Sequence, residues 1–319
     1  MTTALTITVA AALAAVSDDT HGPRLLEQTR RAPKKDDLKP SIHINVELTL
    51  VPVTVTDPFG QVVSGLQKHN FSIYDEKQPR DIAYFSREDA PASVGLVFDM
   101  SGSMKSNMPV AQQAVSKFME TLNPEDEACV VTVSSRPELV SGFTSKAAEI
   151  QNAILFSRAK GMTALIDGVY LALNRVHTGH NPRKAVVVVS DGQDNNSRYT
   201  LRELTSYAME ADAQIYTIAV HENAASAADA SLIDEGEGLL KTLSEKTGGV
   251  HFTISDPNDL PAIMQTVATD LHNLYVLGYY PPDDALPGKY RRIRVQLNVP
   301  KGMPRMQVYA RRGYYAPQS

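Results

Sequence analysis

The sequence of 319 residues predicts an α/β fold, in which a doubly wound, mostly parallel sheet is inserted between the two halves of an all-β, sandwich-like domain. Three observations carry this prediction. Strand and helix patterns alternate between residues 91 and 271, strands of period two precede this region, and similar strands follow it. A long series of alternating strands and helices is typical of a doubly wound sheet.

The N-terminal residues have features of an export signal. Residues 4–16 have the length and apolar content of a signal peptide core, and Ala12-Leu13-Ala14 resembles a small-x-small cleavage site. No Lys or Arg precedes the apolar run, so the basic start of an ordinary signal is missing. We predict an exported protein (periplasmic, cell-surface or secreted), and the missing basic residues keep a cytoplasmic location open. Residues 1–23 are the candidate signal peptide, and the polar residues 24–41 are a linker.

Residues 42–90 carry strand patterns and no helical period, and we interpret them as the N-terminal part of the β-sandwich. Apolar and polar residues alternate from Ile42 to Leu50, which places the apolar side chains on one face of a strand. The phase changes after Leu50, because the next apolar residues are Val51, Val53 and Val55, and we expect a β-bulge there. Shorter strand-like pieces lie around residues 71–74 and 82–85.

Residues 91–271 show the alternation of the α/β part. Ser93–Phe98 and Ala185–Val189 are short, nearly continuous apolar runs, as expected for strands buried on both faces. Apolar residues at helical spacing separate the strands. The expected strands are 93–98, 128–133, 185–189, 215–220 and 250–254, and the expected helices are 108–122, 147–156, 163–176, 201–211, 232–246 and 260–271.

Strand patterns return in residues 272–319, which we interpret as the C-terminal part of the sandwich. Arg292 and Arg294 alternate with apolar residues, and another strand begins at Met306 and ends near Tyr315. Neither terminal piece holds enough strands to bury a core alone. We therefore predict that the two pieces pair into one β-sandwich around the inserted region.

Composition excludes several classes of function. The single cysteine, Cys129, excludes an internal disulfide and a cysteine-built metal site. The net charge of −5 disfavours nucleic-acid binding as the main role, and the solvent-facing arginines near the C-terminus lack the interleaved aromatic residues that such a role requires. No segment has the roughly 18–20 consecutive apolar residues that span a bilayer, so we expect no integral membrane segment.

Three separate loops place oxygen-bearing side chains at one edge of the expected sheet. Asp99 ends the first buried strand and is followed by Ser101 and Ser103, Thr163 precedes a helix, and Asp191 follows the valine-rich strand. Ligands of α/β sheets collect at the carboxyl ends of the parallel strands. Carboxylate and hydroxyl oxygens suit a hard divalent cation such as Mg²⁺.

The same residues resemble a known family. Asp99-x-Ser101-x-Ser103, Thr163 within Gly-x-Thr-Ala-Leu, and Asp191-Gly192 resemble the metal-ion-dependent adhesion site of von Willebrand factor type A domains, and the resemblance covers roughly residues 91–271. It implies that Ser101, Ser103 and Thr163 are hydroxyl ligands, with Asp99 and Asp191 bound directly or through water. It also implies a coordination position left for an acidic group of a partner.

The segments on either side resemble a bacterial subtype of this family. The resemblance rests on the run Tyr275-Val276-Leu277-Gly278-Tyr279-Tyr280-Pro281 and on the ending Arg312-Gly313-Tyr314-Tyr315-Ala316-Pro317.

The resemblance implies a non-enzymatic, adhesion-type module that binds the Asp or Glu of an unknown protein partner through Mg²⁺, with Mn²⁺ or Ca²⁺ as alternatives. Two carboxylates and three neutral hydroxyls around such an ion leave a local charge of about zero, so the ion still attracts an anionic partner. No catalytic residue or organic cofactor site is expected, because no nucleophile elbow, phosphate loop or His-Glu-x-x-His pattern occurs. Two alternatives stay open: a metal-dependent hydrolase, and a cytoplasmic subunit of a chaperone-like or chelatase-like assembly.

Two further acidic or amide segments border the candidate site. Asp194, Asn195 and Asn196 follow Asp191-Gly192, and we expect them to be loop residues at the rim of the site, where a partner could touch them. The acidic string of residues 234–237 is expected to face solvent near a helix start, where negative charge is favoured.

Overall fold

A computed structural model of the protein describes most of the chain after residue 47. The described residues are 48–100, 108–155, 161–221, 227–282, 286, 288–299 and 304–316. The candidate signal peptide and linker lie outside them, and so do Ser101 and Ser103 of the candidate metal site. Within the described ranges, no helix has the length and apolar content that crossing a bilayer requires.

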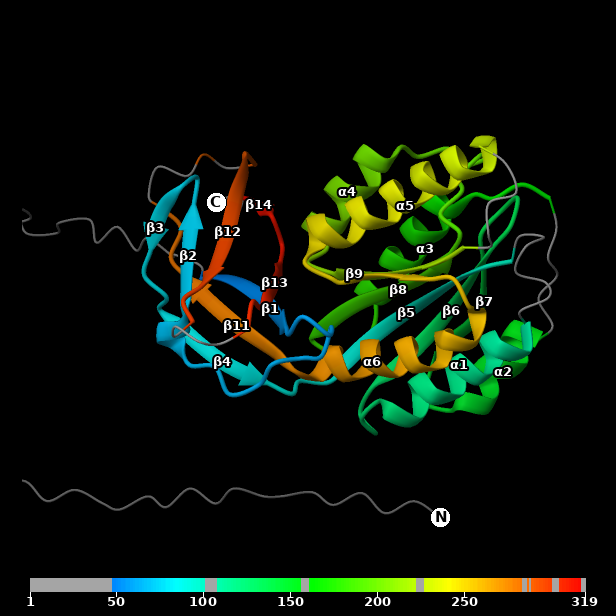
Figure 1. Ribbon diagram of the computed structural model, residues 1–319, viewed down its shortest axis with the longest axis horizontal. Coiled ribbons are helices and arrows are strands. Elements are labelled where there is room, and N and C mark those ends of the chain that lie inside the picture. The colour runs from blue at the N-terminus through cyan, green and yellow to red at the C-terminus, as the bar shows by residue number, and fades with distance from the viewer. Residues whose placement is uncertain are drawn as a thin grey trace, which may run out of the picture. The chain divides into compact units, whose positions relative to one another are not determined.

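The α/β part is built on a six-stranded sheet with the strand order β10-β9-β8-β5-β6-β7 (Figure 1). Five neighbouring strands are parallel, and β7 pairs with β6 in the antiparallel direction. All residues of β5 and β9 are buried, as expected for strands covered on both faces. The strands are β5 (Ala92–Asp99), β6 (Glu127–Val133), β7 (Glu138–Thr144), β8 (Arg183–Ser190), β9 (Gln214–Val220) and β10 (His251–Ile254). The predicted mostly parallel sheet is confirmed.

Helices cover both faces of this sheet (Figure 1). On one face lie α1 (Met108–Thr121), α2 (Ala147–Leu155) and α6 (Leu260–His272), and on the other lie α3 (Leu165–His177), α4 (Leu201–Glu210) and α5 (Ala227–Thr247). Consecutive side chains of β5 pack into different hydrophobic cores, on opposite faces of the sheet. Phe98 packs in the core with Phe118 of α1, and Val97 packs in the core with Leu173 of α3. This alternation is the doubly wound arrangement that the sequence predicts.

Strand β7 is the one strand of this sheet that the sequence reasoning missed. Its residues are exposed or half-buried along the whole strand, because it lies at the edge of the sheet. The apolar pattern that a strand needs for prediction is therefore weak in this segment.

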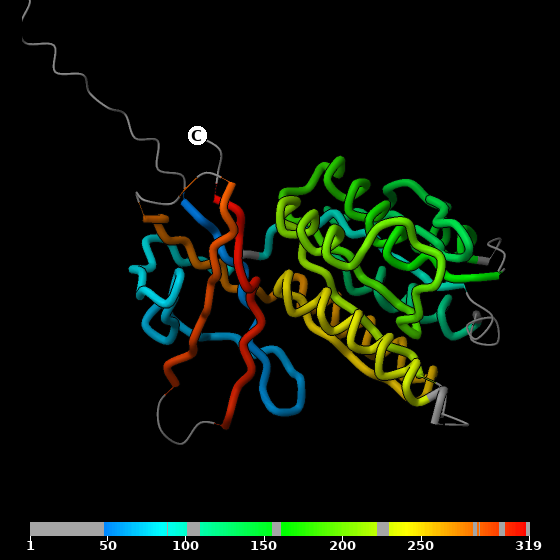
Figure 2. The backbone as a smooth tube through the Cα atoms, turned by 90° about the horizontal axis from the view of Figure 1, so that it is seen from above, coloured from blue at the N-terminus to red at the C-terminus, as the bar shows by residue number. Residues whose placement is uncertain are grey.

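Strands from the two ends of the chain form two further four-stranded sheets, with orders β13-β1-β11-β4 and β14-β12-β2-β3. The early strands are β1 (Thr49–Thr56), β2 (Phe71–Asp75), β3 (Gln78–Arg80) and β4 (Tyr84–Glu88), and the late strands are β11 (Leu274–Tyr279), β12 (Tyr290–Leu297), β13 (Gln307–Ala310) and β14 (Gly313–Tyr315). All their pairings are antiparallel. Figure 2 shows the early blue and cyan segments among the late orange and red ones.

The two sheets share one core. It contains Val53 of β1 and Leu277 of β11 from one sheet, and Ile73 of β2 and Ile293 of β12 from the other. Neither the early nor the late strands could build this core alone, because each sheet takes strands from both. The predicted sandwich of two halves is confirmed.

Two details of the sandwich differ from the prediction. The expected bulge after Leu50 is wrong, because β1 pairs with β11 in continuous register from Thr49 to Val53. The core face of β1 is set by the fully buried valines, whereas Leu50 is 42% exposed. The strand expected from Met306 onward is two strands, β13 and β14, which lie in different sheets.

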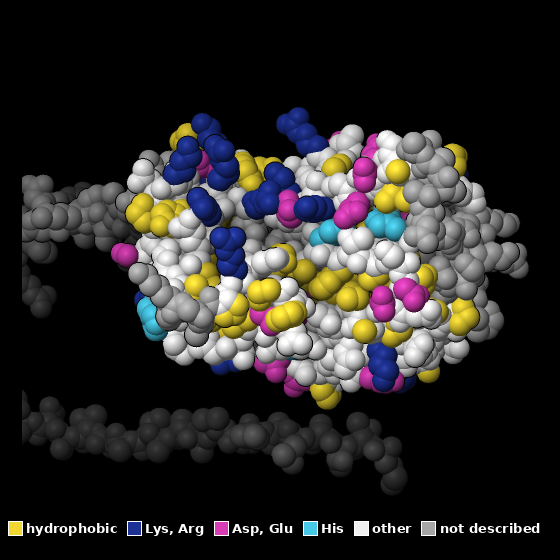
Figure 3. Space-filling view, in the orientation of Figure 1, with side chains coloured by type: hydrophobic (Ala, Val, Ile, Leu, Met, Phe, Trp, Pro, Cys, Tyr) yellow, Lys and Arg dark blue, Asp and Glu magenta, His cyan; other side chains and the backbone are white. Residues whose placement is uncertain are grey.

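The arginines of β12 divide between the two faces of their sheet. Arg292 and Arg294 are exposed, as predicted, whereas the Nε of Arg291 lies 2.9 Å from Oδ1 of the buried Asp75. On the face shown in Figure 3, Lys and Arg side chains gather over the sandwich strands.

Candidate functional site

The carboxyl ends of β5 and β8 bring two of the candidate loops together. These neighbouring strands are parallel and pair Phe98 with Val189, so their last residues lie side by side. Asp99 ends β5 and has no exposed surface. Ser190 ends β8, and its hydroxyl donates a hydrogen bond of 2.7 Å to Oδ2 of Asp99. Asp191 follows directly, so the structure places it near the end of β5, where Asp99 lies.

Ser190 is a residue that sequence reasoning missed. Its hydroxyl oxygen donates to Asp99 and also accepts the N–H of Gly192 at 2.9 Å. A hydrogen bond to a charged group contributes about 1.5–3 kcal/mol, so this serine orients Asp99 and fixes the turn after β8. The pattern that could have revealed it is a hydroxyl residue at the end of a buried valine run, directly before Asp-Gly.

The turn after Asp191 depends on two glycines. Gly192 has a φ of +84°, and a Cβ built on it would lie 2.3 Å from the carbonyl oxygen of Gly236 in α5. A Cβ on Gly236 would lie 2.7 Å from the carbonyl oxygen of Asp191. The backbone of the Asp191 turn therefore touches the backbone of α5, which only glycine at both positions permits.

Thr163 is tied to the loop that follows Asp191. Its N–H donates to Oδ1 of Asn195 at 2.8 Å, and its carbonyl oxygen accepts the N–H groups of Asn195 and Asn196 at 3.0 and 3.1 Å. Thr163 is 4% exposed. The loop that carries Thr163 is therefore fixed to the loop after Asp191 by main-chain and amide hydrogen bonds.

The loop of residues 194–199 and the start of α3 anchor each other. Asp194 Oδ2 accepts the N–H of Ile166 at 2.7 Å. In return, Asp167 Oδ1 accepts the N–H groups of Arg198 and Tyr199 at 3.0 and 3.1 Å. The first turn of a helix has N–H groups without helical partners, so Asp194 satisfies one of them. Asp194 and the two asparagines therefore position Thr163, a role that the sequence reasoning did not assign to them.

The expectation that the acidic string of residues 234–237 faces solvent near a helix start is wrong for its second half. α5 begins at Ala227, so these residues lie inside the helix, and Gly236 is buried against Gly192. Glu237 accepts a hydrogen bond of 3.1 Å from the hydroxyl of Thr253, and its carboxylate lies 3.5 Å from Nε2 of His221 and 3.6 Å from Nε2 of His251.

These contacts change the ionisation of Glu237. Burial alone would raise the pKa of the Glu237 carboxyl, but the Thr253 hydroxyl and the two histidines lower it, and the net pKa is below its ordinary value. Burial holds the pKa of His251 below its ordinary value, although Glu237 opposes this effect. His221 follows Val220, the last residue of β9, and β9 runs parallel to β8. Glu237 and its two histidines therefore lie at the same edge of the sheet as Asp99.

Of the five candidate metal ligands, the structure describes three. It brings Asp99 and Asp191 together through Ser190 and fixes Thr163 to the loop after Asp191, whereas Ser101 and Ser103 lie outside the described residues. In the part of the chain that the structure describes, no three His, Cys, Asp or Glu side chains gather to hold a metal ion. The candidate set contains only two such side chains, so its chemistry would be that of mixed carboxylate and hydroxyl oxygens.

Comparison with known proteins identifies the α/β part. Residues 94–193 match the family model of the von Willebrand factor type A domain. The chain contains a von Willebrand factor type A domain. The matched range of this type A domain includes all five candidate ligand positions. A search of curated protein sequences found no match.

Three solved structures are similar to parts of this chain. A von Willebrand factor type A protein from Catenulispora acidiphila is 12% identical over 84% of this chain and 74% of its own, with a TM-score of 0.49. The conserved hypothetical protein BatB from Bacteroides thetaiotaomicron is 16% identical over 56% of this chain and 98% of its own, with a TM-score of 0.44. Proximal thread matrix protein 1 from the mussel byssus, with a zinc-occupied MIDAS motif, is 22% identical over 62% of this chain and 49% of its own, with a TM-score of 0.45.

Proposed function

We propose that the type A domain is a non-enzymatic module that binds a protein partner through a divalent cation. Asp99, Ser101, Ser103, Thr163 and Asp191 would hold the ion, and the ion would bind an Asp or Glu of the partner. The observation that carries the proposal is the hydrogen bond from Ser190 to the buried Asp99, which joins the first and third of these loops at the carboxyl edge of the sheet.

The described residues fit a hard divalent ion such as Mg²⁺, with Mn²⁺ or Ca²⁺ as alternatives. Their side-chain donors are oxygens only, which is the set that these ions prefer. A carboxylate with no exposed surface, such as that of Asp99, needs compensation by donors or by a cation. When bound, the ion would supply a positive charge that attracts a carboxylate.

The chain's own residues prepare the site. Ser190 orients the carboxylate of Asp99, and Asn195 holds the backbone of Thr163. The close approach of Gly192 to α5 fixes the turn that carries Asp191. Such supporting contacts keep ligands in place before binding, which lowers the ordering cost that binding would otherwise incur.

We also propose that the protein acts outside the cytoplasm. The support is the apolar run of residues 4–16 with a small-x-small sequence near its end. Mass spectrometry of the protein recovered from its native cells tests this. Cleavage after about residue 14 to 23 is expected, and an intact N-terminus on protein recovered from the cytosol would contradict it.

Calorimetric titration with Mg²⁺ tests the metal site. We expect binding heat with the wild-type protein and none with Thr163→Ala or Asp191→Ala, because each variant removes one oxygen ligand. Asp234→Ala is the matched control, since Asp234 is an exposed carboxylate on α5 and lies outside the ligand set. Equal heats in all four proteins would overturn the proposal. Circular dichroism of each variant confirms that it is folded.

Affinity capture from native extract tests the partner. Proteins that bind the wild type should be released by EDTA and should not bind Asp191→Ala. A set of bound proteins that is the same with and without EDTA would contradict recognition through a cation.

A further inference from the structure

A groove with a volume of about 790 Å³ lies beside the candidate metal site. One wall is the connection between β6 and β7, a second is α3, and the third is the loop after β8. Its lining includes Arg136, Asp167, Tyr170, Asn196, Arg198 and Tyr199. A volume between about 300 and 1,000 Å³ is typical of a binding pocket, so this groove has room for several side chains.

The groove begins next to a candidate metal ligand. The side chain of Asn196 donates to the carbonyl oxygen of Ser135 at 2.7 Å, which joins two walls of the groove. The N–H of the same asparagine donates to the carbonyl oxygen of Thr163 at 3.1 Å. A chain segment that reaches the Thr163 loop could therefore continue directly into the groove.

The groove carries more positive than negative charge at its surface. Arg136 is exposed, and the side chain of Arg198 is 81% exposed. The one carboxylate of the lining, Asp167, has a side chain that is only 5% exposed and lies 3.1 Å from Nε of Arg198. That carboxylate also accepts two backbone N–H groups. Among the described residues, Arg136 has no ion-pair partner, so an anionic group entering the groove meets an uncompensated cation.

Two tyrosines of the groove lining, Tyr170 of α3 and Tyr199 of the loop after β8, belong to a stack of three aromatic rings. The ring of Tyr170 stacks between those of Tyr199 and Tyr207, at centroid distances of 4.3 and 4.5 Å and interplanar angles of 10° and 21°. The hydroxyl of Tyr207 donates to Asn174 at 2.5 Å, which fixes the far end of the stack. Stacked rings lose little conformational freedom when a partner binds, so these tyrosines are prepared for contact.

We propose that this groove is the second half of the partner-binding surface, and that it takes an acidic side chain of the same extended protein segment whose Asp or Glu binds the metal ion. This inference rests on the proposed function above. The charge of the groove favours an acidic segment, and its continuity with the Thr163 loop favours one chain that occupies both places. Arg136 and Arg198 would pair with the second acidic side chain, and Tyr199 would contact the segment between the two acidic residues.

Selection from a random peptide library displayed on phage tests the proposal, with the immobilised full chain and Mg²⁺ present. The wild-type protein should select peptides with two acidic residues at a fixed spacing. Thr163→Ala should select none of them. Arg136→Glu should still select peptides in a Mg²⁺-dependent way, but only the acidic residue that binds the ion should remain enriched. Arg202→Glu is the matched control, because Arg202 is exposed on α4 outside the groove, and it should behave as wild type.

The outcomes separate the two proposals. Enrichment of a single acidic residue that is unchanged by Arg136→Glu would overturn the groove and leave the metal-dependent function standing. If the wild-type protein selects no Mg²⁺-dependent peptide, the proposed function fails and the groove proposal fails with it. For a selected peptide made synthetically, Arg136→Glu should weaken binding roughly fivefold or more and reduce its dependence on salt, as expected for a lost exposed ion pair made repulsive. A change below about twofold would also overturn the groove proposal.

Discussion

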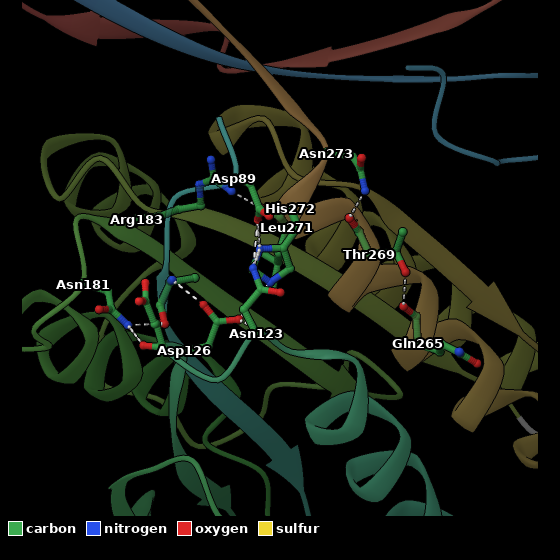
Figure 4. Close-up of polar contacts among 12 residues, drawn as sticks. Asp89, Asn123, Asp126, Asn181, Arg183, Gln265, Thr269, Leu271, His272 and Asn273 are labelled. Carbon is green, nitrogen blue, oxygen red and sulfur yellow. Dashed lines mark hydrogen bonds and ion pairs between the residues drawn. The ribbon is translucent and has the colours of Figure 1, made fainter. Parts of the chain in front are cut away.

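The ring of His272 lies against the buried carboxylate of Asp126, with 2.8 Å between Nε2 and Oδ2 (Figure 4). Its other ring nitrogen, Nδ1, lies 2.8 Å from Oδ1 of Asp89. A neutral imidazole has only one N–H, so two carboxylates at this distance favour the doubly protonated, charged ring. Asp89 lies in the segment between β4 and β5, and His272 ends α6, so one imidazolium holds both segments that join the sandwich strands to the α/β part.

This arrangement predicts that stability falls as pH rises above neutrality. Burial alone would lower the pKa of His272, but Asp126 and Asp89 raise it, and the net pKa lies above its ordinary value. A raised pKa in the folded state means that the stabilisation is complete below the unfolded pKa of about 6.5 and is lost as pH rises through the folded pKa. His272→Gln should remove this loss. Urea unfolding at a series of pH values from 6 to about 9 measures it.

Protonation of Asp126 should weaken the same ion pair at low pH. Burial would raise the pKa of Asp126, but His272 and the N–H of Ala92 lower it, and the net pKa is below its ordinary value. Its contribution is present above the unfolded pKa and is lost as pH falls through the folded pKa. If His272→Gln and wild type lose stability equally above neutrality, the charged bridge is contradicted.

Asp270 predicts a second pH effect. Burial raises its pKa to about 7, and neither carboxylate oxygen has a hydrogen-bond partner among the described residues. Because the folded state favours the protonated acid, stability should fall as pH rises from the unfolded pKa of about 3.9 to the folded value. Asp270→Asn, which cannot ionise, should be more stable than wild type at about pH 8 by roughly 1–3 kcal/mol and show a smaller difference at about pH 5. Thermal unfolding at both pH values checks this, and equal destabilisation at both would contradict it.

The Ser190 hydroxyl predicts a change in metal affinity. Ser190→Ala removes the donor that orients Asp99, and loss of such a supporting contact costs roughly tenfold or more in affinity. Titration with Mg²⁺ or Mn²⁺ measures the effect. Ser244→Ala is the control, because Ser244 is equally buried but its hydroxyl donates to the carbonyl oxygen of Lys241 within α5. Unchanged affinity in Ser190→Ala would show that Asp99 does not need this hydrogen bond.

Two glycines of the same helix give a matched pair of stability predictions. Gly236→Ala would place a methyl group 2.7 Å from the carbonyl oxygen of Asp191, whereas a Cβ on Gly238 meets nothing within 4 Å. We expect Gly236→Ala to destabilise the protein by about 1–3 kcal/mol and to weaken metal binding. Gly238→Ala should instead stabilise it by up to about 1 kcal/mol through helix propensity. Urea unfolding of both variants provides the comparison, and equal effects would contradict the close contact.

Much of the fold could be predicted because its strands are buried on both faces. The apolar runs that became β5 and β8 have no exposed residue in their centres, so their sequences are nearly uniform in hydrophobicity. The alternation around Arg292 and Arg294 located β12 for the opposite reason, because one face of that strand meets solvent. The edge strands β3 and β7 were missed, since neither has a buried face.

Residues of the candidate site could be proposed from the sequence only where the residue type itself indicates chemistry. Asp99, Thr163 and Asp191 were proposed from their residue types and spacing. A local pattern shows that a hydroxyl residue, Ser190, directly precedes Asp191, but it does not show the hydrogen bond of Ser190 to Asp99 on the neighbouring strand. The burial of Gly236 could not be predicted either, because it also depends on a contact between distant parts of the chain. Its contact with Gly192 joins residues far apart in sequence, and no local pattern reports such a contact.

The pairing of β1 with β11, which joins Thr49 to Tyr279, has a consequence for protein synthesis. When β1 leaves the ribosome, its partner strands have not yet been made, and at about 5–20 residues per second the delay is on the order of tens of seconds. During that time the valines of β1 have no cover from β11 or β13. We expect the α/β region, which separates β1 from β11 in sequence, to fold first and to bring its two ends together. This shortens the loop that must be closed when β1 pairs with β11. We therefore expect nascent β1 to need protection from aggregation until β11 has been made.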